Sequence, residues 1–399
     1  MNRVKKISKW ICVPLLVVAM AIVVTSFSPV YNFTPAAPFS GNDIFNPYRN
    51  FDHNTKWSRA NFHTHTKVDG LLNECEHTPE QVIEYYDKFD YDIVGFSNHN
   101  CLTSYSTDSI HKITIYEHGY NLFKFHKLVF GCSEVNHFDH LLPIFASQKQ
   151  FILDLLGHNS DLVVFNHPIR TSALDSYQMQ LLGGYDIIEL DSGRSTENRY
   201  WDEALTAGNY SFALANDDLH YPDRSNAIAR RCNFLQVTSN SYSDIRSTLK
   251  QGCYYSMRVP DYGNGDWQQK IECNRHLPAI KNIGVDGNTV YIALTEAADS
   301  IKVIGQHHTT LAKGTACDSL SYTMAESDSY SRFIAYFAQG EVIYSNPFAR
   351  YDSAVSDRPT TRAAAEINIP LTILFNLTLV VLLISIVVIV IKTIFVWRD

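Results

Sequence analysis

Residues 162–168 read LVVFNHP, four apolar residues that lead directly into an asparagine, a histidine and a proline. An apolar run without polar alternation is typical of a strand that is buried on both faces of a parallel sheet. Four more such runs occur at residues 92–96, 128–130, 187–190 and 212–215. Helical stretches lie between them, so the sequence predicts an α/β fold, either a barrel or a doubly wound sheet.

The ends of two helices can be read between these runs. Thr78 is an N-cap residue followed by proline, and Gln81 completes a capping box, which predicts a helix that continues to residue 89. A second helix is expected over residues 196–207, because Gly208 is a suitable C-cap. Beyond about residue 276 the sequence pattern changes to short runs in which apolar and polar residues alternate. These predict a small antiparallel β module that ends near residue 351.

Side chains that bind metals follow the apolar runs repeatedly. In parallel α/β folds such groups gather at the carboxyl ends of the strands, so separate segments are expected to meet at one place. Imidazole nitrogens and carboxylate oxygens suit Zn, Mn or Fe. The residues in question are His63 and His65 after Phe62, His99 after Phe96, Glu134 after Phe130, His167 after Phe165, and Asp218 and His220 after Ala215.

A single histidine after a strand is more often structural than a metal ligand, and His118 and His126 are interpreted as structural on that ground. An isolated Glu134 or Asp218 would likewise usually be a solvated loop carboxylate. Here, however, five separate segments each place a residue of ligand type after a predicted strand. For the set as a whole, metal binding is therefore a better interpretation than a structural role. The sequence therefore predicts a metal site.

The same segments resemble the motifs of the polymerase and histidinol phosphatase (PHP) superfamily over roughly residues 59–260. FHTHTKVDG is similar to the opening His-x-His motif and ALANDDLHY to the closing Asp-x-His motif. GFSNHN, GCSEVN and VVFNHP resemble the motifs between them, in the same order. One departure is Asn98, where the family has an aspartate before the motif histidine. Asn98 cannot supply the same charge and is expected to orient His99 instead.

The resemblance implies a distorted (β/α)7 TIM-like barrel over residues 59–275, with two or three divalent metal ions (Zn, Mn or Fe) held by side chains. It implies a first metal held by His63, His65, Glu134 and Asp218. A second would share Glu134 and take His167 and His140, and a third would use Asp69, His99 and His220. Two positions stay open, because His137 competes with His140 and Asp217 competes with Asp218.

The function implied is hydrolysis of a phosphoester by a hydroxide that bridges two metals, with Glu134 as the bridging carboxylate. Arg170 resembles a family arginine that binds phosphate, and His220 or His99 is a candidate to protonate the leaving oxygen. One alternative is a nuclease or oligonucleotide phosphodiesterase. Another is a non-catalytic envelope sensor or binding protein that keeps its metals for structure.

Both ends of the chain are apolar. Residues 10–30 follow a basic start, and residues 367–391 precede Lys392, each run being near the length that crosses a bilayer. The first is expected to be an uncleaved signal anchor, with a cleaved signal peptide as the alternative. The basic N-terminus places both termini in the cytoplasm and the domain between them outside the cytoplasmic membrane.

The net charge is distributed unevenly along the chain. It is +4 over residues 1–42 and +1 over residues 367–399, so the whole-chain net charge of −8 leaves −13 on residues 43–366. Residues 43–366 therefore lack the basic surface that a stable nucleic-acid partner would require.

The features above divide the chain into six parts. They are a first membrane helix (1–31), a connector (32–58), the catalytic domain (59–275), the β module (276–351), a linker (352–366) and a second membrane helix (367–392).

Overall fold

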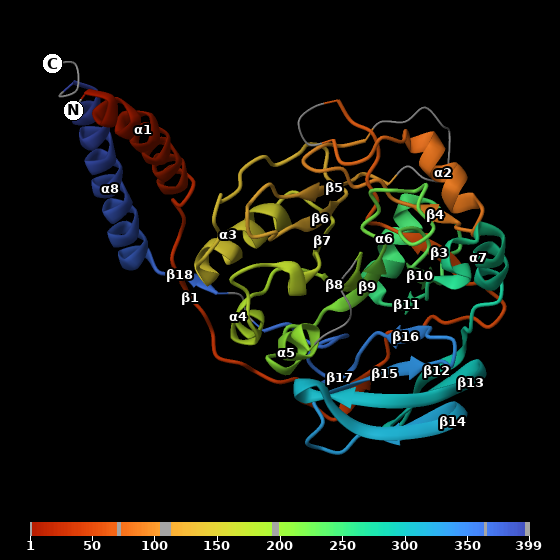
Figure 1. Ribbon diagram of the computed structural model, residues 1–399. Coiled ribbons are helices and arrows are strands. Elements are labelled where there is room, and N and C mark those ends of the chain that lie inside the picture. Colours follow the sequence, from red (N-terminus) through yellow and green to blue (C-terminus); the bar gives the residue numbers. More distant parts are fainter. Residues whose placement is uncertain (1, 70–72, 104–112, 194–198, 363–364, 396–399) are drawn as a thin grey trace.

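The computed structural model describes residues 2–69, 73–103, 113–193, 199–362 and 365–395. The chain forms a mixed α/β body, beside which two long helices, α1 (Asn2–Val24) and α8 (Ile369–Phe395), lie against each other (Figure 1). The predicted α/β class is confirmed.

A five-stranded sheet forms one half of the body. Its strands lie in the order β5 (Ile115–His118), β6 (Lys127–Phe130), β7 (Leu162–Phe165), β8 (Ile187–Ser192) and β9 (Phe212–Asn216). β7, β8 and β9 are parallel, whereas β6 runs antiparallel to both of its neighbours. The carboxyl ends of β5, β7, β8 and β9 therefore share one edge of the sheet with the amino end of β6.

An eleven-stranded sheet forms the other half. β3 (Ser58–Asn61) pairs in parallel with β4 (Ile93–Val94) and antiparallel with β10 (Arg231–Leu235), which pairs with β11 (Tyr254–Arg258). The other pairings are antiparallel. The remaining strands are β2 (Asp43–Phe45), β12 (Ile280–Asp286), β13 (Thr289–Gly305), β14 (Thr309–Thr323), β15 (Tyr330–Tyr336), β16 (Val342–Ser345) and β17 (Phe348–Tyr351).

The expected (β/α)7 barrel is corrected to two sheets. In the part of the chain that the structure describes, isolated parallel bridges join them: His99 with Glu117, and Thr64 with Leu219. Each bridge is a single residue pair, so no continuous ladder closes a barrel there. β4 is only two residues long and β6 runs against its neighbours, which limits the pairing that a closed parallel barrel requires.

Helices cover the five-stranded sheet on its outer side (Figure 1). α3 (Ala146–Gly157), α4 (Ser176–Leu181) and α5 (Tyr200–Thr206) share one apolar core with that sheet. The helix expected from residue 196 corresponds to α5, and residue 196 itself lies outside the described residues. The side chains that these helices bury in the core include Ile152, Leu153, Met179, Trp201 and Leu205.

The other helices of the body are α2 (Pro79–Asp87), α6 (Tyr242–Gln251) and α7 (Trp267–Asn274). α2 begins with the predicted capping box, in which Thr78 accepts a hydrogen bond from the Gln81 backbone and Gln81 accepts one from the Thr78 backbone.

The strands expected as a β module continue the eleven-stranded sheet. β16 pairs with β11, and β17 pairs with β2, which comes from the connector before the first predicted strand. Arg332 on β15 also reaches α5, where its Nε and Nη2 donate to the Asp202 carboxylate at 2.9 and 2.7 Å. Both side chains are fully buried. The module is thus fastened to the rest of the body by a ladder and by an internal ion pair.

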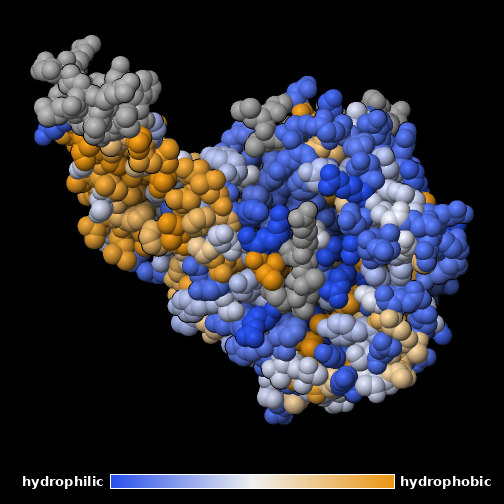
Figure 2. All heavy atoms as spheres, viewed as in Figure 1, coloured by the Kyte–Doolittle hydropathy of each residue, from blue (hydrophilic) through white to orange (hydrophobic). Residues whose placement is uncertain are grey.

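The two terminal helices pack against each other. Val23 of α1 and Leu379 and Ile386 of α8 form a small apolar cluster. Where the pair meets the body, β1 (Tyr31–Asn32) and β18 (Glu366–Ile367) form a two-stranded antiparallel sheet. Figure 2 shows the apolar surface of the pair beside a mainly hydrophilic body.

One helix of the described residues, rather than the expected two, is long and apolar enough to cross a membrane. It covers Ile369–Thr393 with a mean hydropathy of 3.1. The apolar part of α1 is the shorter Ile11–Val24, because the helix ends at Val24 instead of continuing to residue 30. At about 1.5 Å per residue it covers roughly 21 Å, less than the ~30 Å of a bilayer core.

Candidate metal centre

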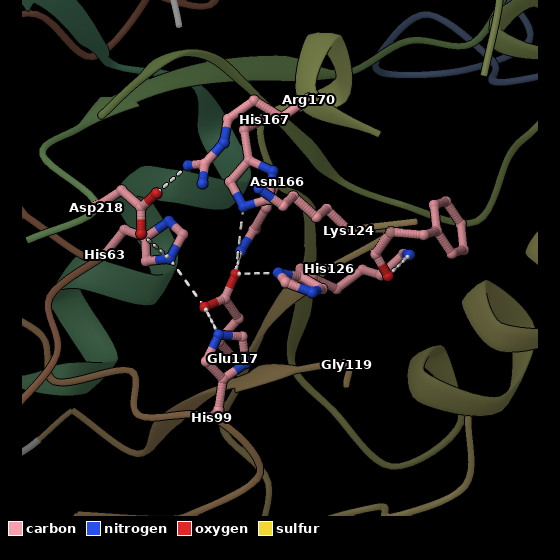
Figure 3. A network of polar contacts seen from close by, with 12 residues as sticks. His63, His99, Glu117, Gly119, Lys124, His126, Asn166, His167, Arg170 and Asp218 are labelled. Carbon is pink, nitrogen blue, oxygen red and sulfur yellow. Dashed lines mark hydrogen bonds and ion pairs between the residues drawn. The ribbon is translucent and has the colours of Figure 1, made fainter. Parts of the chain in front are cut away.

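Histidine and carboxylate side chains meet at the edge shared by the carboxyl ends of β5, β7, β8 and β9 and the amino end of β6 (Figure 3). Four overlapping groups of these side chains have ligand atoms close enough to share an ion. They are His63, His65, Glu117 and Asp218; His63, His167 and Glu189; His65, Glu74 and His99; and His99, Glu117 and His126.

Glu117, at the end of β5, lies at the centre of the cluster and is fully buried. Its Oε2 is 3.1 Å from Nε2 of His63, 3.4 Å from Nε2 of His65 and 3.1 Å from Nε2 of His99. Its Oε1 faces a second set, 3.2 Å from Nδ1 of His126 and 3.4 Å from Nε2 of His167. The two oxygens of one carboxylate therefore face two different groups of histidines.

Asp218 closes the first group from the opposite side. Its Oδ1 is 3.2 Å from Nε2 of His63 and 3.4 Å from Nε2 of His65. The backbone of Asp218 has a φ of 49°, in the left-handed region that non-glycine residues seldom adopt.

Glu74 forms a further group with His99 and His220. Its Oε2 is 3.1 Å from Nε2 of His99 and 3.4 Å from Nε2 of His220. The Nδ1 of His220 donates to the carbonyl oxygen of Asp218 at 2.8 Å. That hydrogen bond assigns the proton to Nδ1 and leaves the lone pair of Nε2 directed at the group.

The geometry fits divalent ions better than hydrogen bonds alone. Nε2 of His63 and Nε2 of His65 are buried and have no hydrogen-bond partner among the described residues, although carboxylate oxygens lie 3.1–3.4 Å away. Ligand atoms about 2.0–2.2 Å from one ion are themselves roughly 3.0–3.5 Å apart. The ligands of a shared cation likewise lie close together without forming hydrogen bonds to one another.

Neutral and acidic groups behind the ligands fix their orientation. Glu189 on β8 accepts from Nδ1 of His63 at 2.9 Å through Oε1, and from the backbone N–H of His167 at 3.1 Å through Oε2. Asn166 donates to Oε1 of Glu117 at 2.9 Å. Such partners set the tautomer and direction of a metal-binding imidazole.

Asn98 links two of the ligand segments. Its amide oxygen accepts from the backbone N–H of Thr66 at 2.8 Å, and its nitrogen donates to the Thr66 hydroxyl at 2.7 Å. Thr66 follows His65, and Asn98 precedes His99. The Asn98 amide therefore ties the two strand ends together.

The ionisation of the cluster follows from this crowding. Burial alone would raise the pKa of Glu117, but His99, His63 and His126 outweigh it and hold that pKa well below its usual value. Burial opposes the charge of His63, but Glu117, Glu189 and Asp218 raise its pKa well above the usual value. By the same balance Glu117 and Glu74 raise the pKa of His99 to about 9. Metal-free protein thus holds protons on the imidazoles of His63 and His99, whereas burial lowers the pKa of His126 to about 4.

Arg170 approaches the cluster from its rim. It lies in the 3-10 turn Pro168–Arg170 after β7, and its Nη1 forms an ion pair with Oδ2 of Asp218. About a third of its side chain is exposed, whereas Asp218 is almost completely buried. The guanidinium is therefore the positive group that an incoming anion would meet.

The structure brings together most of the sequence-predicted site residues, but Glu134 is a correction. Glu134 is exposed and belongs to none of the candidate groups. It follows β6, and because β6 runs antiparallel to β5 and β7, the residues after it lie at the opposite edge of the sheet. Glu117 takes the central position instead. The predicted residues that do meet are His63, His65, His99, His167, Asp218 and His220.

His140 and Asp69 are also corrected. His140 is buried, but its Nδ1 donates to the carbonyl oxygen of Thr25 at the end of α1, and His126 faces Glu117 in its place. Asp69 is exposed and outside the groups, and Glu74 approaches His99 instead. The alternatives left open resolve similarly, since Asp217 accepts backbone hydrogen bonds from residues 229–231 and His137 is exposed.

Four members of the cluster were missed by reading the sequence: Glu74, Glu117, His126 and Glu189. A signal existed for Glu117, because the segment ITIYEH at residues 113–118 is another apolar run that ends in a carboxylate and a histidine. His126 precedes its strand instead of following it, so a search of carboxyl ends passes over it. Glu189 lies inside β8, where an acidic residue otherwise indicates a solvent-facing position.

Comparison with known proteins gives little beyond this geometry. No protein-family model matches the sequence, and no curated protein matches it. Among solved structures, the chain is similar to a two-domain protein from Bacteroides vulgatus that contains a predicted PHP-like metal-dependent phosphoesterase. The identity is 12%, the match covers 79% of this chain and 100% of the other, and the TM-score is 0.37. At that TM-score function has to be argued from the cluster itself.

Proposed function

We propose that the chain is a metal-dependent phosphoesterase whose central carboxylate is Glu117. The observation that carries the proposal is that Oε1 and Oε2 of Glu117 face separate histidine groups, while Asp218 completes one of them. A carboxylate shared between two ligand sets is the arrangement that two adjacent ions require. Structural single-ion sites have no need of it.

One ion would be held by His63, His65, Glu117 and Asp218, whose ligand atoms lie close to one another. A second would be held by Glu117, His126 and His167, because both imidazoles face Oε1 of Glu117. A third would be held by Glu74, His99 and His220. The donor atoms are all nitrogen and oxygen, which suits Zn, Mn or Fe.

Such ions, when bound, supply a water of lowered pKa and neutralise charge on phosphate oxygens. The side chains of the protein bind the substrate and orient the ligands. Arg170 offers a positive charge at the rim, where it can hold a phosphate oxygen while Asp218 fixes the direction of its guanidinium. Glu189 keeps His63 in one tautomer throughout. His220 serves here as a ligand, because its Nδ1 proton is committed to the Asp218 carbonyl.

A matched pair of glutamate substitutions tests this assignment. Glu117→Gln in the full-length protein should lower hydrolysis of an aryl phosphate about 100-fold or more and lower the bound metal, because one charge shared by two sites is lost. Glu134→Gln, the same change at an exposed glutamate outside the cluster, should leave both unchanged. Equal turnover by the Glu117→Gln variant and the parent protein would rule the proposal out.

We further propose that α8 crosses the cytoplasmic membrane and that α1 packs along it, with the catalytic body outside and both termini inside. The apolar part of α1 is shorter than a bilayer core, so its crossing depends on all 23 residues of the helix, about 34 Å, with the basic first turns at the inner surface. The helices lie side by side with their outer ends together (Figure 1). The basic residues Arg3, Lys5, Lys6 and Lys9 lie in the outer part of α1, and Lys392 lies in the outer part of α8. Protease added to right-side-out membrane vesicles should degrade the body, and inverted vesicles should protect it. The reverse pattern would contradict this orientation.

A further inference from the structure

The loop that joins two candidate metal ligands is fastened to the membrane-helix end of the molecule. Residues 118–125 run from Glu117 to His126, and they contact the segment 138–145. The imidazole of His118 donates to the carbonyl oxygen of Phe138 at 2.9 Å, and the backbone N–H of Leu122 donates to the carbonyl oxygen of Leu141 at 3.1 Å.

A buried polar contact makes this attachment firm. Asn121 is 4% exposed, and its amide nitrogen donates to Asp139 at 2.8 Å and to the carbonyl oxygen of Phe125 at 3.1 Å. The backbone N–H of Tyr120 donates to the same carboxylate of Asp139 at 3.0 Å. The loop therefore cannot shift relative to segment 138–145 without breaking buried hydrogen bonds.

Segment 138–145 in turn contacts both terminal helices. Thr25, at the end of α1, accepts hydrogen bonds from the His140 imidazole and, at 3.2 Å, from the backbone N–H of Leu141. The ring of Phe145 meets the ring of Phe375 on α8 edge to face, with centroids 6.3 Å apart. Phe375 lies in the second turn of the helix that is long enough to cross a membrane. Segment 138–145 therefore lies beside the end of that helix that adjoins the body.

Both segments expose large apolar side chains, which we call the interfacial patch. Single exposed apolar residues are ordinary, but these are joined through the contacts above to the apolar surface of α8. Lys124, exposed in the same loop, adds a positive charge that an anionic headgroup would meet. The patch consists of Tyr120, Leu122, Phe138, Ile144 and Phe145, which are between 39% and 68% exposed.

We infer that the substrate is a phosphoester carried by a membrane lipid, presented to the metal edge from the bilayer through the interfacial patch. This rests on the proposed phosphoesterase function and names the class of its substrate. Apolar side chains next to a membrane helix insert into the acyl boundary, which holds the adjoining loop at headgroup level. That loop begins at Glu117 and ends at His126, so it would connect the bilayer surface directly to two candidate metal ligands.

The first experiment compares lipid and soluble substrates with the full-length protein in phosphatidylcholine vesicles. Phosphatidate serves as the lipid monoester, phosphatidylglycerol as the lipid diester, and glycerol 3-phosphate and an aryl phosphate as soluble controls. One of the lipids should be hydrolysed with a kcat/KM at least about tenfold above that of glycerol 3-phosphate. Hydrolysis of the aryl phosphate without any preference for a lipid overturns the inference alone, whereas no hydrolysis in any arm overturns the proposed function with it.

Patch variants provide a second test. Leu122→Ser combined with Phe145→Ser should lower the ratio of lipid to aryl phosphate hydrolysis about tenfold, since two apolar side chains no longer insert. Val355→Ser removes an equally apolar side chain that is 80% exposed after β17 and should leave the ratio unchanged. A ratio that stays the same in the double variant counts against the patch.

Contact with the bilayer can also be measured without any activity. A phosphatidylcholine with a photoactivatable acyl chain should crosslink to residues 118–125 and 138–145 in vesicles and leave residues 352–356 unlabelled. Labelling confined to α1 and α8 overturns the inference even if the enzyme proves to be active.

Discussion

The imidazole of His63 lies against Glu189, whose Oε1 accepts from Nδ1 at 2.9 Å, while Nε2 of the same ring faces Glu117 at 3.1 Å. The side chains of His63 and Glu189 are both completely buried. A histidine held in this way has one nitrogen committed to orientation and the other available to an ion.

Glu189→Gln should therefore weaken metal binding and turnover without unfolding the protein. An amide can present its nitrogen or its oxygen to Nδ1, so the tautomer of His63 is no longer enforced. Outer-shell changes of this kind cost about 10–100-fold in affinity or activity. Titration of the metal-free variant with Zn, alongside Glu134→Gln as control, measures the effect. Parent-like affinity would mean that Glu189 has no orienting role.

Metal uptake should release protons and weaken as the pH falls. The pKa of His63 lies well above its usual value and that of His99 is about 9, so both are protonated at pH 7 in metal-free protein. An ion needs the lone pair that the proton occupies, and affinity therefore rises with pH as these imidazoles lose their protons. Calorimetric titration in buffers of different ionisation enthalpy counts the protons. Binding that releases none between pH 7 and 9 would contradict the ionisation state assigned to the cluster.

His126 and His140 form a matched pair of buried histidines with different surroundings. His126→Ala should lower the bound metal, because its Nδ1 faces Glu117. His140→Ala should leave the metal content unchanged and lower stability by about 1–3 kcal/mol, because it leaves the Thr25 carbonyl without its donor. Elemental analysis and thermal unfolding of both variants separate the two effects. Loss of metal in His140→Ala alone would restore the expectation drawn from the sequence.

The ion pair between Asp202 and Arg332 should be essential for attachment of the β strands to α5. Asp202→Asn leaves a fully buried guanidinium without its counter-charge, which costs about 3–5 kcal/mol. Burial would raise the pKa of Asp202, but Arg332 and His308 outweigh it and lower the pKa. Its contribution is therefore complete at neutral pH and is lost as the pH falls through that lowered pKa. Denaturant unfolding at several pH values measures this, and a variant as stable as the parent at pH 7 would exclude it.

The sequence reveals the α/β class and a large part of the cluster, because those features are local. His167 lies two residues after the end of β7 and His99 five residues after the end of β4, so an apolar run with a ligand beyond its end places each of them. The capping box at Thr78 and the apolar length of α8 are equally local. Glu134 met the same local criterion as His167 and still lies elsewhere.

What only the tertiary structure decides is the direction of each strand. The sequence alone shows which ligands follow apolar runs and that the C-terminal apolar segment is long enough to cross a membrane, because both features depend only on neighbouring residues. The antiparallel pairing of β6 depends on contacts with β5 and β7, which come from other parts of the chain. That pairing brings His126 to the metal edge and carries Glu134 away from it, since reversing a strand exchanges its two ends.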